Sequence, residues 1–143
     1  MPLQTAFYDK VTAKGTKQLY PLGTIRVEGN KVYKYVKSSG IINNNDVATA
    51  AAAGTVKVTG ASLKGIGVNS TGADTADGEY FWMQVAGETN AFDSSGATGV
   101  GYPLYAVDAT GLMSGTAASA SAVGTSTIAV DNATGYAVLA GLL

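Results

Sequence analysis

The carboxylates that could do chemistry gather in one segment, GADTADGEY, at residues 72–80. It holds Asp74, Asp77 and Glu79, and glycoside hydrolysis requires a pair of such groups. The segment is rich in turn-forming residues, however, and lacks the apolar surroundings that make one carboxyl a proton donor. Its spacing also departs from the alternating D-x-D-x-D-G of an EF-hand calcium loop. We therefore interpret these residues as turn-forming, solubilising acids and predict no metal site.

Two residue types that catalytic and metal sites often use are missing from the sequence. There is no His and no Cys, which removes the commonest general base near neutral pH, the commonest transition-metal ligand and all thiol chemistry. No Walker-type phosphate loop and no G-x-S-x-G nucleophile elbow occurs, and residues 96–101 (GATGVG) lack the strand–helix context of a nucleotide site. A Ser–Lys pair stays formally open without a motif to support it. The sequence predicts no catalytic residue, no cofactor and no enzymatic activity.

The aromatic segment GEYFWMQVAG, at residues 78–87, contains the only Trp of the chain. Such a cluster could line a substrate pocket, stack on a sugar ring or form a strand that is buried on both faces. Large apolar side chains occupy both the odd-numbered and the even-numbered positions, so both faces of a strand would need a cover. One cover is the core, and the other is a second layer, a loop or a neighbouring subunit. The residues predicted to lie in the strand core or at a subunit interface are Tyr80, Phe81, Trp82, Met83 and Val85.

Charge is divided unevenly along the chain. Residues 1–37 carry a net charge of +5 and residues 38–143 a net charge of −6. Either the basic residues form a solvated face, or a cationic N-terminal arm binds an acidic neighbour. Nucleic acid is not expected as a partner, because the basic residues are few and the rest of the chain would repel phosphate. The residues predicted to bind a partner are Lys10, Lys14, Lys17 and Arg26.

The elements that position these residues are expected to be strands. The chain has 143 residues, of which 19 are Gly and only 13% are charged, a mixture that disfavours long helices and suits short strands joined by tight turns. We predict an all-β fold, or a mainly β fold with one short helix, in a compact β-sandwich or barrel-like domain. Residues 1–19 are expected to be an extended basic arm that is ordered only when something holds it, and residues 20–143 a single β-rich domain. Neither a signal peptide nor a membrane span is predicted.

Three local patterns refine this prediction. Ile25 and Val27 alternate with polar residues, as in a half-buried strand, and Gly29 with Asn30 offers a hairpin turn into a second strand. Asp46 followed by VATAAAA and Gly54 is typical of a capped short helix, with a surface loop as the alternative. The apolar residues 135–143 are expected to pair into the sheet or into a partner.

Four of these segments together resemble the small auxiliary head proteins of tailed bacteriophages, which are the capsid decoration or cement proteins. They are residues 22–26 (LGTIR), 32–36 (VYKYV), 78–87 and 101–105 (GYPLY). The resemblance implies a β-rich homotrimer on the outer surface of the head, where it clamps the major capsid protein and reaches the lattice with its N-terminal arm. Its partners would be the major capsid protein and itself, without direct contact to nucleic acid or membrane. Its location would be the capsid surface of the virion, after synthesis in the host cytoplasm.

Two other classes of protein stay open at this point. Another virion component, such as a tail-tube, head–tail connector or fibre-base protein, would share the composition and differ in the symmetry of its assembly. A carbohydrate-binding module would place Tyr80 and Trp82 in an exposed shallow groove.

Overall fold

The structure is a computed structural model of the whole chain. It describes residues 7–52, 54–58, 66–93, 97–101, 103–106, 112–114, 124–126, 130–131 and 134–140. These residues form strands and connecting segments with no helix among them, so the prediction of an all-β fold is confirmed. The strands are β1 (Lys14–Gly15), β2 (Ile25–Glu28), β3 (Lys31–Ser38), β4 (Val47–Ala50), β5 (Thr55–Val58), β6 (Gly67–Val68), β7 (Tyr80–Asp93), β8 (Ala97–Thr98), β9 (Pro103–Ala106), β10 (Met113–Ser114), β11 (Gly124–Ser126), β12 (Val130–Asp131) and β13 (Thr134–Ala140).

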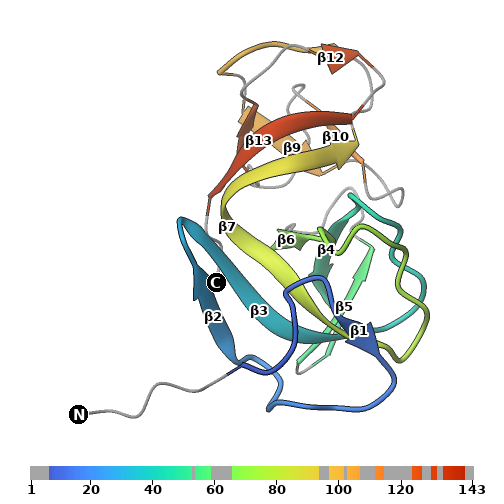
Figure 1. Cartoon of the computed structure of the whole chain (residues 1–143). Coiled ribbons are helices and arrows are strands. Elements are labelled where there is room, and N and C mark those ends of the chain that lie inside the picture. The colour runs from blue at the N-terminus through green and yellow to red at the C-terminus, as the bar shows by residue number, and fades with distance from the viewer. Residues whose placement is uncertain are drawn as a thin grey trace.

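Strands β3, β4, β5, β6 and β7 close into a small barrel (Figure 1). β3 pairs with β7, β7 with β6, β6 with β4, β4 with β5, and β5 returns to β3, where the pairing is parallel. Closure uses the strand edges that an open sheet of the same strands would leave free. β2 extends this sheet beyond β3 as the first half of a hairpin, and β1 pairs with the beginning of β7. The prediction of a barrel-like domain is therefore confirmed.

The barrel interior is filled by apolar side chains from four of its strands and the loop after β3. Each of these side chains is almost completely buried, and burial of a large apolar side chain contributes about 1.5–3 kcal/mol to folding. The inward face of β7 supplies three of them, as the alternation in residues 78–87 predicts. The members of this cluster are Val36, Ile42, Ala48, Val56, Phe81, Met83 and Val85.

The long strand β7 runs out of the barrel and continues the same sheet with a further set of strands (Figure 1). Its pairing with β3 ends at Ala86, and from there to Asp93 it pairs with β13, which is followed by β11, β9 and β10. Gly87 stands at this change of partner with a φ of 86°, a conformation that favours glycine. Side chains of β4, β6, β9, β10 and β13 form a second apolar cluster, made of Val47, Val68, Leu104, Met113 and Leu139.

The predicted hairpin is confirmed, but the buried residue of its first strand is the charged one. β2 and β3 are joined through Gly29 and Asn30, and Gly29 takes the positive φ that this tight turn needs. Arg26 is only 7% exposed, whereas Ile25 and Val27 are 42% and 64% exposed. β2 lies beyond the closed barrel, so the face of Ile25 and Val27 is not covered, while the face of Arg26 is drawn against the aromatic residues described below.

The prediction of a short helix after Asp46 is wrong, because residues 47–50 form strand β4. β4 lies between β5 and β6 and pairs with both, and its residues Val47 and Ala48 are fully buried. Asp46 still terminates a turn, since its carboxylate accepts a hydrogen bond from the backbone N–H of Asn43 at 3.1 Å. Sheet hydrogen bonds and burial outweigh the helix preference of a few Ala residues.

The described residues contain no helix of a length and apolarity that would cross a bilayer.

Candidate functional site

Residues 7–20 lie along the outer face of β3 and β7. β1, within this segment, pairs antiparallel with β7 through Lys14 opposite Phe81 and Gly15 opposite Tyr80. The prediction of an extended arm must therefore be corrected for residues 7–19, because the barrel of the same chain holds them. We call residues 7–20 the N-terminal segment.

The N-terminal segment supplies the second cover of the aromatic strand. Trp82 is 0% exposed and meets Phe7, Tyr20 and Tyr35 at ring-centroid distances of 5.1, 5.2 and 4.9 Å. Phe81, Met83 and Val85 are buried on the opposite face, in the barrel interior. The predicted burial of both faces is thus correct for these residues, and it is achieved within one chain. Their alternative assignment to a subunit interface is not what the structure shows, since a single chain already covers them.

Asp9 is the polar centre beneath this cover. Its carboxylate accepts hydrogen bonds from Trp82 Nε1 at 3.0 Å and from the Tyr20 hydroxyl at 2.8 Å. The guanidinium of Arg26 pairs with the same carboxylate at 3.4 Å and donates to the backbone carbonyl of Asp9 at 2.9 Å. Sequence analysis missed Asp9, although its negative charge in an otherwise basic segment was a signal of internal pairing.

The prediction that Arg26 binds a partner must be corrected as well. Its guanidinium is shared between Asp9 and Glu28. It also lies over the rings of Phe7 and Trp82, at 4.8 and 5.3 Å from their centroids, which are favourable cation–π distances. All of these contacts lie within the chain, so the guanidinium of Arg26 stabilises the fold and does not face a partner.

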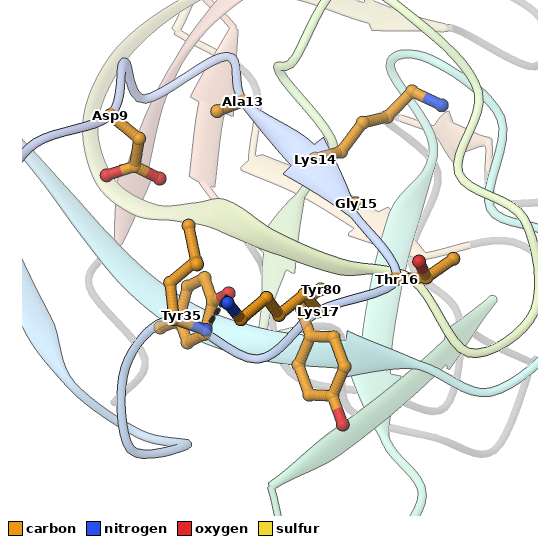
Figure 2. Close-up of a pocket in the computed structure, with 9 residues that line it drawn as sticks. Asp9, Ala13, Lys14, Gly15, Thr16, Lys17, Tyr35 and Tyr80 are labelled. Carbon is orange, nitrogen blue, oxygen red and sulfur yellow. Dashed lines mark hydrogen bonds between the residues drawn. The ribbon is translucent and has the colours of Figure 1, made fainter.

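A pocket of about 190 Å³ lies between part of the N-terminal segment and the strands β3 and β7 (Figure 2). On its floor, the half-buried ring of Tyr80 stacks on Tyr35 at 6.1 Å with an interplanar angle of 16°. The Tyr35 hydroxyl accepts a hydrogen bond from the backbone N–H of Leu19 at 3.2 Å. Burial raises the pKa of Tyr35 above its usual value of 10.0, so this hydroxyl stays protonated at neutral pH. The residues that line the pocket are Asp9, Ala13, Lys14, Gly15, Thr16, Lys17, Leu19, Tyr35 and Tyr80.

The three predicted lysines are all exposed on the N-terminal segment, but they differ in their partners. Lys14 pairs with Glu79 at 3.1 Å, and in Figure 2 its ammonium points away from Tyr35 and Tyr80. Within the described part of the chain, no acidic group pairs with the ammonium of Lys10 or of Lys17. The structure therefore brings Lys14 and Lys17 to the pocket and leaves Lys10 on the same segment outside it.

The carboxylates of residues 72–80 are held by three different partners. Asp74 accepts a hydrogen bond from the backbone N–H of Asn44, and Asp77 accepts one from Gly40, both at 2.8 Å. Glu79 belongs to the ion pair with Lys14. No group of three or more acidic side chains among the described residues is placed to hold a metal ion. Asp74 and Asp77 therefore tie their segment to the loop after β3, a long-range role that differs from the local turn formation expected from the sequence.

Sequence analysis also missed Asn69, which organises the loops on this side of the barrel. It is fully buried, and its side-chain amide donates to the carbonyl oxygens of Ile42, Asn43 and Ala73. Its side-chain oxygen accepts from the hydroxyl of Thr71 at 2.8 Å. Such a saturated buried amide fixes loop geometry.

A scan against models of protein families finds none that matches this chain, and a search of curated proteins finds no match either.

Proposed function

We propose that this protein is a structural component of a phage virion, which binds the outer surface of the head and stabilises the lattice of the major capsid protein. In this proposal it acts as a decoration protein, three copies of which assemble at three-fold positions of the lattice. It has no catalytic role there. The sequence resemblance is the starting point for the proposal. The observation that supports it is the exposure of Lys10 and Lys17, which have no acidic partner among the described residues.

Lys10 and Lys17 are exposed, and neither pairs with an acidic group of the residues that the structure describes. Both lie on a segment that is held against the barrel. The fastening includes the β1–β7 pairing and the hydrogen bond from Trp82 to Asp9. A partner with an acidic surface would meet these cations on an already ordered backbone, which reduces the entropy lost on binding. Such contacts are individually weak, but repetition around a shell turns modest affinities into durable attachment.

A carbohydrate-binding function is not supported by the position of the indole. Trp82 is 0% exposed, and its N–H is used by Asp9. A sugar platform requires an aromatic face in solvent, and of the two residues expected in such a groove only Tyr80 is partly exposed.

Co-sedimentation with heads that lack decoration tests the proposal. The wild-type protein is expected to bind such heads, and to bind less as ionic strength rises from about 50 mM to about 500 mM, because salt screens exposed charges. Lys10→Glu is expected to weaken binding about fivefold, the equivalent of an exposed ion pair worth on the order of 1 kcal/mol. Lys57→Glu, a matched charge reversal at an exposed position of β5, is the control and should bind as the wild type does. Failure of the wild type to bind heads, or binding to tails in place of heads, would contradict the proposal.

A further inference from the structure

The pocket under the N-terminal segment has the size of a site for one side chain. Its volume is about 190 Å³, whereas pockets for small molecules and cofactors usually measure about 300–1,000 Å³. Its floor is formed by the stacked rings of Tyr35 and Tyr80, and β1 and Lys17 form its rim (Figure 2). A short apolar stem with a polar end would fit this shape.

The charges around the pocket favour an anion. Asp9 also lines it, but its carboxylate is already shared by Arg26, Tyr20 and Trp82. Glu79 nearby is neutralised by Lys14. No acidic group of the described residues pairs with Lys17 at the rim, and Lys37 adds a second cation at 5.5 Å from the centroid of the Tyr80 ring.

A second donor comes from the buried face of the pocket. The oxygen of Tyr35 accepts the N–H of Leu19, but no described residue accepts the hydroxyl proton of Tyr35. A carboxylate in the pocket would receive that proton in a hydrogen bond and an ion pair from Lys17. Hydrogen bonds to an ionised acceptor are the strong ones, particularly away from water.

We propose that this pocket binds the side-chain carboxylate of a partner's glutamate, with Lys17 and Tyr35 on the carboxylate and the Tyr80 ring on its methylene groups. We take glutamate in preference to aspartate because its side chain presents one more methylene group to the aromatic floor. The identity of the partner as a capsid protein rests on the proposed function, whereas the binding chemistry does not.

Titration with N-acetylglutamate amide, followed by NMR, tests the pocket without a capsid. The expected result is a saturable shift of the Tyr35 and Tyr80 ring signals. The Kd should be on the order of millimolar, which corresponds to a binding free energy of about 4 kcal/mol. N-acetylglutamine amide, the neutral probe of the same shape, should not produce it. Lys17→Gln should abolish the shift and Lys17→Arg should retain it, while Lys57→Gln is the matched control. Equal shifts with both probes, or no saturation by about 100 mM of the charged probe, would overturn the proposal.

Head binding separates this proposal from the proposed function. The expectation is that Lys17→Gln weakens head binding more than Lys57→Gln does. If the wild type binds heads and the two variants bind equally well, the pocket does not take the partner's carboxylate and the function stands. If the wild type does not bind heads, the function fails, and the titration alone decides the pocket.

Discussion

Arg26 occupies a position that charged side chains usually avoid, since it is buried between the N-terminal segment and the barrel. Removing a guanidinium from water is costly, and the cost is offset only when its hydrogen bonds and its charge are satisfied. Asp9 and Glu28 supply the charge, and the rings of Phe7 and Trp82 supply the faces on which the guanidinium lies. The residue therefore fastens the N-terminal segment and is unavailable to a partner.

The buried position of Tyr33 leads us to expect that the protein loses stability at alkaline pH. Burial, more than the charge of Glu28, raises the pKa of Tyr33 above 10.0. The pKa of Tyr33 is therefore higher in the folded than in the unfolded state. The contribution of Tyr33 to the free energy of unfolding is fully present below about pH 10 and is lost as the pH rises through the folded-state pKa. Tyr33→Phe should leave the free energy of unfolding nearly unchanged at pH 7, because the hydroxyl has no hydrogen-bond partner among the described residues, and should reduce its fall between about pH 8 and pH 11.

Urea unfolding at a series of pH values measures this effect. Tyr8→Phe is the matched control, since Tyr8 is almost fully exposed and its substitution should leave the alkaline slope as in the wild type. Identical slopes for the Tyr33 and Tyr8 variants would show that burial of Tyr33 does not govern the alkaline transition.

The N-terminal segment is an element whose place depends on a few long-range contacts. Asp9→Ala removes the acceptor of Trp82 Nε1 and one counter-charge of Arg26, so it should lower the free energy of unfolding by about 3 kcal/mol. It should also loosen the cover of the indole and increase acrylamide quenching of Trp82 fluorescence. Glu88→Ala, at an exposed position of β7, should change neither quantity. Unaltered quenching in the Asp9 variant would mean that other contacts suffice to hold the segment.

The same packing affects how the role of the segment can be tested. Deletion of residues 1–17 would remove Phe7 and Asp9 from Trp82 as well as the exposed lysines. A loss of binding in that variant would combine lost charge with a damaged fold. Single substitutions at Lys10 and Lys17 avoid this, because both side chains are exposed.

On the scale of the whole molecule, β7 changes its partner from β3 to β13 next to Gly87. A Cβ at this position would collide with the carbonyl oxygen of Asn30, in the β2–β3 turn, and the φ of 86° is itself unfavourable for alanine. Gly72 has a similar φ of 84° but open space around it. Gly87→Ala should therefore destabilise the fold by more than about 3 kcal/mol, and Gly72→Ala by only about 1 kcal/mol. Equal melting temperatures of the two variants would show that the close approach at Gly87 is relaxed at no cost.

The sequence by itself determined the features that depend on neighbouring residues. The all-β class, the β2–β3 hairpin and the two-faced burial of residues 81–85 all follow from local spacing and residue type. These patterns act over a few residues, which is the range that a pattern in the sequence can report.

Tertiary structure alone decided which face of an element is inside. A period of two shows that Ile25 and Val27 share a side of β2, but the position of β2 beyond the closed barrel leaves that side exposed and buries Arg26. The Ala-rich residues 47–50 became a strand because β5 and β6 offered hydrogen bonds on both edges. Asp9 and Trp82 are 73 positions apart, and no local pattern encodes their contact. Burial and charge pairing between distant segments outweigh local preference, because their free energies are larger than the fractions of a kcal/mol that separate one local conformation from another.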